Sequence, residues 1–544
     1  MNRRGWRWLM VIGMVIGMAP LAPLGVVADD IDLTDCQDES AFDDALVEAH
    51  KNGGGTITII CSGEIPISLR KEITGSVKIV AVGEVTLEGT GDTRSFTVSP
   101  GSTLELVGLT LQNGKVGTSQ DGGVIYNDGG TVTVAYCTFE GNSAEFMGGA
   151  IFSDGGTVTV TDSHFNGNVA GMGGVIDSTA GTLFVSDSYF AGNIAGHSGG
   201  AISYDGTLSE LIVTGSTFTD NHAETGDGGA INNNTLGPLT VTDSIFISNS
   251  ANRFGGAIHN GNSLKLTVAA STFIGNSAIQ GGAITSGGTF PIEVIASTFI
   301  DNRGGQSGGG AIFGASSLFR VTDSTFAGNS AEIHGGGAIR GGLALEITSS
   351  TFSGNHAGDH GGGAIFVTGK LQVTATTFSG NRAGDGGGGA IFADTATVTL
   401  QSTILTSSSP VTCVTRMGTI TSSGYNLSDD DSCGLETEKG DIPGSTNINL
   451  GPLGDNGGPT QTMLPLDGSA AIDAIPREAC EAHSSERDQR GLPRPQGPDA
   501  RSARSNWQAR CCAPTVRPGS SPERRPTGSA RRRAIPCCCP RSSR

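Results

Sequence analysis

Two histidines in neighbouring repeats are the residues with the clearest potential to bind a metal ion. His334 and His360 are 26 residues apart, and each precedes three glycines. Asp359 lies beside the second histidine, and Asp385 occupies the following repeat. If the repeats stack, these side chains come within about 5 Å of one another, which suits a divalent cation held by imidazole and carboxylate groups. The alternative is a solvated ladder of polar surface residues, and calorimetric titration with zinc distinguishes the two.

No set of residues indicates catalysis. A glycoside hydrolase needs two carboxylates at a defined separation, and a calcium-dependent lyase needs clustered acidic ligands with a basic residue. Asp162, Asp187, Asp243 and Asp323 each come immediately before a Ser-x-Phe phrase. An active site interrupts a repeat, whereas these aspartates follow it, so we predict a turn or ladder role for them. We therefore assign no catalytic residue and expect no cofactor.

One phrase recurs ten times between residues 139 and 391: Phe-x-x-Asn, a loop, then Gly-Gly-Ala-Ile or a close variant. Consecutive phenylalanines are 25 to 28 residues apart. A period of this length is typical of a solenoid, in which each unit packs only against its neighbours. The phenylalanines are Phe139, Phe165, Phe190, Phe218, Phe246, Phe273, Phe299, Phe326, Phe352 and Phe378. The asparagines are Asn142, Asn168, Asn193, Asn221, Asn249, Asn276, Asn302, Asn329, Asn355 and Asn381.

The repeat predicts an all-β fold, a right-handed parallel β-helix with two recognisable strands in each copy. An alternating run such as residues 157–161 places valines on one face, and the Ala-Ile step provides a second, shorter strand. We expect the phenylalanines to stack inside the solenoid. We expect the asparagines to lie at sharp turns with a left-handed backbone and to hydrogen-bond from coil to coil. The paired glycines permit positive φ and close backbone approach.

A short capping helix is predicted ahead of the coils, at residues 40–52. It has an apolar face that includes Phe42 and Leu46, and Ser40 with Asp43 resembles a capping box. Such a helix would cover the unpaired strand edges of the first coil.

Four cysteines flank the repeat region in two pairs. We predict that Cys36 pairs with Cys61 and that Cys413 pairs with Cys433 in disulfides, because an exported chain meets an oxidising environment. Neither pair has a spacing typical of zinc ligands.

Charge is divided unevenly along the chain. From residue 487 onward 14 arginines oppose 3 acidic residues, a balance of +11, whereas residues 29–486 hold 16 basic and 49 acidic residues, a balance of −33. The acidic body repels nucleic acid and anionic membrane surfaces, so we expect neither as a partner. Solubility is one explanation of this charge, and cation binding is the other.

Residues 1–28 are typical of a secretory signal peptide. Arg3, Arg4 and Arg7 precede an apolar run, and the small residues 26–28 form a cleavage site. The alternative is an uncleaved anchor helix. No other stretch is long and apolar enough to span a bilayer, so we expect no transmembrane span in the mature chain.

The two repeated phrases resemble the repeats of chlamydial-type polymorphic outer-membrane proteins over about residues 109–405. The resemblance implies a right-handed β-helical passenger at the cell surface, with adhesion as its usual role. Proteins of that family end in an outer-membrane barrel, and no series of alternating strands of about ten residues follows residue 406. We therefore do not expect autotransport.

Residues 445–495 resemble the choice-of-anchor Q region of bacterial surface β-helix proteins. The matching phrases are Leu-Gly-Pro-Leu at 450–453, Asn-Gly-Gly-Pro-Thr at 456–460, Gly-Ser-Ala-Ala-Ile-Asp-Ala at 468–474 and Asp-Gln-Arg-Gly at 488–491. The resemblance implies a secreted, envelope-associated protein and does not identify the anchor.

The tail beyond Pro498 departs from that resemblance. Residues 499–506, back-translated and read two bases later, spell Cys-Ala-Ile-Gly-Ala-Phe-Glu, which fits the continuation expected for the region. We hypothesise a frameshift near Pro498, which resequencing of the gene tests. The alternative is a genuine disordered basic tail.

We divide the chain into a signal peptide (1–28), an N-terminal cap with the first coils (29–108), β-helix repeats (109–405), C-terminal coils with the anchor-like region (406–498) and an irregular basic tail (499–544). The predicted function is structural or adhesive and non-catalytic, at the cell surface or envelope, with an unknown surface protein or glycan as partner. The outer membrane is a candidate location. An extracellular polysaccharide lyase or glycoside hydrolase is the alternative, and it predicts a repeat-breaking cluster of acidic and basic side chains in one groove. A passive spacer is a third option.

Overall fold

The computed structural model describes residues 30–51, 53–118, 120–206, 210–288, 290–306, 308–333, 335–407, 409, 411–483 and 487–494. The chain separates into two compact units, 1–507 and 508–544, and every described residue belongs to the first. The predicted signal peptide and basic tail lie outside the described residues. Within the described part of the chain, no helix has the length and apolarity needed to cross a bilayer.

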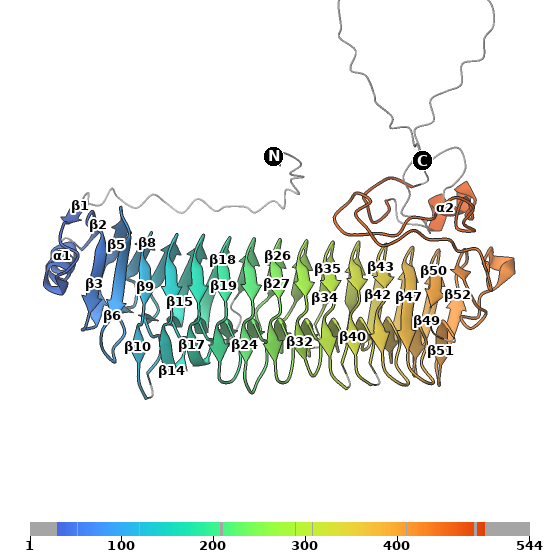
Figure 1. Ribbon diagram of the computed structural model, residues 1–544, viewed down its shortest axis with the longest axis horizontal. Helices are drawn as coiled ribbons and strands as arrows, with labels where there is room; N and C mark the ends of the chain where they lie inside the picture. Colours follow the sequence, from blue (N-terminus) through green and yellow to red (C-terminus); the bar gives the residue numbers. More distant parts are fainter. Residues whose placement is uncertain are drawn as a thin grey trace, which may run out of the picture. The chain divides into compact units, whose positions relative to one another are not determined.

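The described unit is a parallel β-solenoid of about 15 turns with very little helix, which confirms the predicted fold class. Successive coils follow one another from helix α1 to strand β52 (Figure 1). One representative coil contains β25 (Ile231–Asn233), β26 (Leu239–Thr242), β27 (Ile245–Ile247) and β28 (Ser250–Ala251). The two strands recognised in each repeat are present, as β25 and β26, and the coil adds two that were not predicted, β27 and β28. The added strands have two or three residues, which is too short to show a period in the sequence.

Each coil pairs with the next in register, so that equivalent residues stack. The following coil contains β29 (Ile258–Asn260), β30 (Leu266–Ala269), β31 (Thr272–Ile274) and β32 (Ser277–Ala278). The first two strands of each coil belong to a 28-stranded sheet and the last two to a 25-stranded sheet. A change at one repeat position therefore contacts the same position in the coils on either side.

The repeated phenylalanines form a continuous stack in the interior. All ten are fully buried, and neighbouring ring centroids are 4.7 to 4.9 Å apart. This spacing is the distance between hydrogen-bonded strands, so the rings stack because the backbone places one in every coil.

The repeated asparagines line one corner of the solenoid and hydrogen-bond from coil to coil. Asn276 Nδ2 donates to Phe246 O at 3.0 Å and to Asn302 Oδ1 at 3.0 Å. Its Oδ1 accepts from the backbone N and the Nδ2 of Asn249, both at 3.0 Å. These bonds satisfy backbone groups that the sharp turn removes from the β-ladder.

The expectation that these asparagines adopt the left-handed backbone was wrong. The residue before each asparagine has positive φ instead: Gly141, Gly167, Gly192, Asp220, Ser248, Gly275, Asp301, Gly328, Gly354 and Gly380. The asparagine side chain must point inward to reach its partners, so the neighbouring residue makes the turn. The preceding corner works in the same way, and the four recurrent aspartates are its turn residues, with φ between 46° and 51°. Serines follow them in a second ladder, as in Ser271 N donating to Ser297 Oγ at 3.2 Å.

The second glycine of each pair lies where the backbones of adjacent coils approach most closely. A Cβ atom on Gly256 would lie 2.1 Å from Gly282 O and 2.5 Å from Ser277 N. Both atoms belong to the backbone, which cannot rotate away as a flexible side chain would.

Gly256→Ala is therefore expected to weaken the surrounding coils by about 3 kcal/mol, as overpacking against backbone does. Hydrogen exchange followed by mass spectrometry should show faster exchange between residues 245 and 286. Gly117→Ala is the matched control, since nothing lies within 4 Å of its added Cβ. Equal protection in the two variants would contradict the packing argument.

Helix α1 (Glu39–Lys51) precedes the coils and packs on β1 (Asp30–Leu33) and β2 (Gly54–Ile59). It buries Phe42, Leu46 and two alanines against the first coil. Its N-terminal cap differs from the predicted capping box, because the Asp38 carboxylate accepts the backbone N of Ser40 at 2.9 Å. Asp43 instead pairs with Lys71 across the helix–coil boundary. In this cap Cys36 and Cys61 are joined by a disulfide.

The C-terminal segment turns back along the solenoid. Cys413 is joined to Cys433 by a disulfide, and the last paired strand of the second sheet is β53 (Leu427–Ser428). The chain continues through a 3-10 helix (Thr437–Lys439) and α2 (Arg477–His483). Figure 1 shows this orange-to-red segment beside the coils that carry β35 (Thr298–Ile300) and β43 (Thr351–Ser353).

Residues 460–461 and 487–491 form a polar contact between this C-terminal segment and the coils. Gln489 is buried, and its Nε2 donates to Thr325 Oγ1 at 3.0 Å and to Thr460 Oγ1 at 2.8 Å. Its Oε1 accepts from Thr351 Oγ1 at 2.7 Å. The neighbouring Asp488 and Arg490 form a buried ion pair at 2.6 Å. We call these residues the clasp.

Candidate functional site

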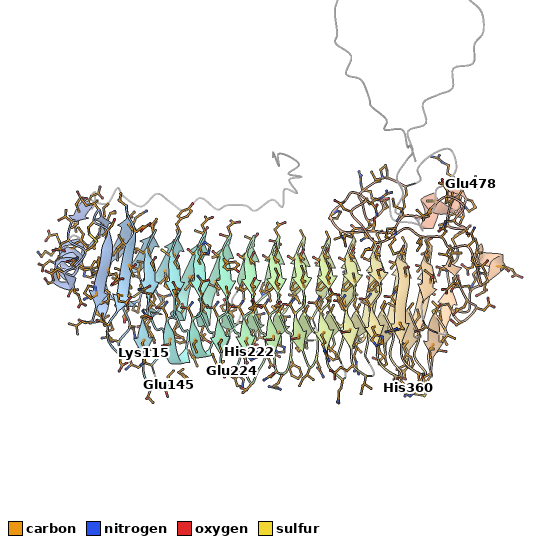
Figure 2. The ribbon with its side chains drawn as sticks, in the orientation of Figure 1. Lys115, Glu145, His222, Glu224, His360 and Glu478 are labelled. Carbon is orange, nitrogen blue, oxygen red and sulfur yellow. A yellow bond between two sulfur atoms is a disulfide. The ribbon has the colours of Figure 1, made fainter. Side chains whose placement is uncertain are left out.

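The residues proposed for metal binding lie at exposed turns. Asp359 Oδ1 accepts the backbone N of Asp385 at 3.0 Å, and His360, with φ of 56°, donates its backbone N to Asp385 O at 2.9 Å. Figure 2 shows His360 at the edge of the solenoid. His334 lies outside the described residues. Among the residues that the structure describes, no group of three His, Cys, Asp or Glu is placed to hold a metal ion.

The ladder phenylalanines and asparagines are fully buried and the cysteines form the two bridges, so these residues hold the fold and present no surface to a partner. A different set of residues faces outward from the first strand of each coil. Each of these first strands contributes three residues. The side chains of the first and third lie in the interior, as those of Ile202 and Tyr204 in β21 (Ile202–Tyr204) do. The middle residue points the other way.

We call the stacked middle residues the crease column. Each is the register partner of the next, so neighbours lie about 4.8 Å apart. The column contains Thr97, Tyr126, Phe152, Asp177, Ser203, Asn232, His259, Thr285, Phe313, Arg340, Phe366 and Phe392.

The crease column is largely covered although it points outward. Phe152, Asp177 and Asn232 are 5%, 1% and 5% exposed. The backbone of the glycine pairs lies against them, since a Cβ on Gly173 would be 2.9 Å from Asp177 Cβ. The first glycine of each pair therefore makes room for a side chain in the crease.

Polar groups occupy the centre of the column in four consecutive coils, at Asp177, Ser203, Asn232 and His259. Among the described residues, no hydrogen-bond partner exists for Asp177 Oδ2 or His259 Nδ1, nor for Oδ1 of the adjacent Asp227, whereas the Ser203 hydroxyl bonds the Asp177 and Asp205 carboxyls. Leaving a buried polar atom unpaired costs about 1–3 kcal/mol. The asparagine and serine ladders of the same coils are satisfied, so the cost is confined to the crease.

Burial sets the protonation of these groups. It raises the pKa of Asp177 to about 8, and the Ser203 hydroxyl opposes this shift while the Asp205 and Asp121 carboxylates add to it. Burial also raises the pKa of Asp205, with Asn234 and Ser203 opposing. It lowers the pKa of His259, an effect that Asp227 opposes and Arg253 reinforces. At neutral pH the centre of the column is therefore a row of largely uncharged hydrogen-bonding groups.

Asp177→Asn is expected to remove a pH dependence of stability. The folded-state pKa of about 8 lies above the ordinary value of 3.8, so the folded chain holds a proton between these pH values that the unfolded chain loses, and stability falls as pH rises. At pH 8 the variant should be more stable than wild type, by up to about 5 kcal/mol. Near pH 4 the difference should disappear.

Thermal unfolding of both proteins from pH 4 to pH 9 measures this difference. Comparing the two cancels the titration of every other group, including Asp323, whose pKa burial raises to about 6. A constant difference across the range would contradict a buried neutral carboxyl at Asp177.

Aromatic rings flank the polar centre at both ends. Tyr126 and Phe152 have ring centroids 5.3 Å apart, and the Arg94 guanidinium lies 4.7 Å from the Tyr126 ring. At the other end, Arg340 lies between the rings of Phe313 and Phe366, at 5.6 and 5.1 Å. The column thus changes from aromatic to polar and back to aromatic along the solenoid.

The crease column was not predicted from the sequence. Its members follow the Gly-Gly-Ala-Ile phrase by one position, where the residue type differs in nearly every copy. That variation, at a position flanked by fixed residues, is the signal that would have identified the crease column.

Comparison with known proteins adds one finding. Five segments match the Chlamydia polymorphic membrane protein repeat: residues 136–154, 215–234, 243–261, 349–368 and 375–394. No characterised protein and no solved structure matches the chain. Each matched segment runs from the corner before a stacked phenylalanine to the first strand of the next coil. Five segments of the parallel β-solenoid are therefore similar to the Chlamydia polymorphic membrane protein repeat.

Proposed function

We propose that this protein is an exported, surface-displayed solenoid that contacts a partner through outward-facing side chains, in a structural or adhesive role without catalysis. The observation that carries the proposal is the set of five polymorphic membrane protein repeats within the coils. That repeat family points to the outer membrane or cell surface, and the signal-like residues 1–28 agree with export.

The outer surface fits a binding role because its side chains vary while the interior is constant. The last strand of each coil presents one outward residue, and in successive coils these are Lys115, Ser143, Val169, Ile194 and His222. Figure 2 shows Lys115, Glu145, His222 and Glu224 along one edge of the solenoid. Further along this face a groove of about 590 Å³ runs past the half-exposed Ile279 and the ion pair of Arg303 with Glu332 at 2.9 Å.

Protease treatment of intact producing cells tests surface display. Proteinase K should remove epitopes in residues 109–405 while an intracellular protein stays intact. Persistence of these epitopes on intact cells, with digestion only after lysis, would refute surface display.

A polysaccharide-degrading enzyme is the second candidate, and the crease favours it. Asp177, Asp205 and Asp227 with His259 and Arg253 form the repeat-breaking acidic and basic cluster that such an activity requires. A glycosidase acid must reach its substrate and hold a proton, and the edge residue Asp205 fits both conditions because burial raises its pKa. Release of reducing ends from neutral and acidic polysaccharides, lost in Asp205→Asn, would support this candidate; no release would exclude it for those substrates.

A further inference from the structure

We infer that the polar centre of the crease column, from Asp177 to His259, is a binding site for a neutral oligosaccharide lying along the solenoid axis. The inference rests on the proposed binding role and specifies the chemistry of the partner.

The first step is the concentration of unpaired polar atoms. Three such atoms lie in neighbouring coils of the described residues, at Asp177, Asp227 and His259. Native proteins pair nearly all buried polar groups, and exceptions call for bound water or ligand. Departures from the usual rules of packing and hydrogen bonding occur mainly at functional sites.

The second step is the chemistry of the groups. A protonated carboxyl, a hydroxyl, an amide and an imidazole follow one another at about 4.8 Å, and each can both donate and accept a hydrogen bond. Hydroxyl groups of a sugar have the same dual character. The aromatic rings of Phe254, which stacks with His259 at 5.8 Å, and of Tyr126 lie nearby for contact with the apolar faces of sugar rings.

The third step is access. Asp177 and Ser203 are fully covered, whereas Asp205, Asp227 and His259 are half-buried at the edge of the crease. We therefore assign direct ligand contacts to the edge groups. Asp177 and Ser203 are positioning residues, because the Ser203 hydroxyl hydrogen-bonds the carboxyls of both Asp177 and Asp205.

The fourth step is charge. The balance of −33 over residues 29–486 disfavours an acidic glycan. The carboxylates of Asp121 and Asp154 near the Tyr126 end of the column add to this preference, which Arg94 opposes.

Calorimetric titration of the full chain at pH 7 with cellohexaose, maltohexaose and chitohexaose tests the inference, with an oligogalacturonate as the acidic probe. We expect saturable binding of at least one neutral hexasaccharide and none of the acidic probe. His259→Ala and Asp205→Asn should weaken binding at least tenfold. His164→Ala is the matched control, because this exposed histidine lies on β16 (His164–Asn166), away from the crease column, and should leave affinity unchanged.

Circular dichroism of each variant confirms that the solenoid is retained. Absence of binding by all three neutral sugars, preference for the acidic probe, or equal affinity of the His259 and His164 variants would each overturn the site. These results are independent of the protease experiment on cells. Failure of glycan binding with surface display intact removes this inference alone, and failure of display leaves the binding result standing.

Discussion

Gln489→Ala is expected to release the C-terminal segment from the solenoid. The side chain donates to Thr325 Oγ1 and Thr460 Oγ1 and accepts from Thr351 Oγ1, all within a buried contact. Truncation leaves the buried Thr351 Oγ1 without its acceptor, which costs about 1–3 kcal/mol. Thr325 Oγ1 and Thr460 Oγ1 keep their bonds to Gln461 O and Asp323 O. The loss is enough to raise the open population of the segment about tenfold or more, although the apolar contact of Ile475 with Ala375 remains.

Limited trypsin digestion measures the release. Cleavage after Arg477 and Arg487 should accelerate at least tenfold, while the coils between residues 110 and 400 stay resistant. Gln461→Ala is the matched control, because the exposed Gln461 contributes only its backbone carbonyl, which accepts from Thr325 Oγ1 at 2.6 Å. Equal cleavage rates in the two variants would show that Gln489 does not hold the segment.

The clasp could not be predicted from the sequence. Gln489 and Thr325 are 164 residues apart, and no period relates them. Resemblance to an anchor region drew attention to Asp-Gln-Arg-Gly at 488–491, but similarity gives no information about what a motif contacts. The threonines it contacts also look ordinary, since the same position is half-exposed in other coils, as at Thr298.

Stacked positions were predictable because in-register pairing repeats one environment in every coil. Phe246 and Phe273 meet the same neighbours, so the same residue type is suitable in both and a period results. The turn residue escaped prediction for the opposite reason. Gly275, Ser248 and Asp220 all tolerate positive φ when the surrounding bonds impose it, so the residue type varies and the invariant asparagine beside them was mistaken for the cause.

The crease column escaped prediction because the residue type at its position differs from coil to coil. Asp177, Ser203 and His259 share one structural position and differ in chemistry. A periodicity argument treats such a position as variable surface. Only the fold shows that its members form one column, enclosed by glycine backbone.

Asn276→Ala is expected to open the solenoid locally. The change removes the acceptor of Asn249 N and of Asn249 Nδ2 and the donor to Phe246 O. No water replaces them without disrupting the corner, because Asn276 is fully buried. At about 1–3 kcal/mol for each orphaned group, we expect the protection of the adjacent coils to fall by roughly 3–6 kcal/mol.

Hydrogen exchange resolves where this loss falls, which matters because a repeat array does not unfold as one unit. Protection should drop between residues 245 and 303 and remain unchanged beyond two coils on either side. Asn262→Ala supplies the comparison, since Asn262 is exposed and donates only to Asn234 Oδ1. If both variants keep wild-type protection, the hydrogen bonds of the asparagine ladder do not stabilise the solenoid. A local loss confined to the Asn276 variant would establish that the ladder holds consecutive coils together, because the asparagine amide is the only side chain of that corner bonded to both neighbours within the described residues.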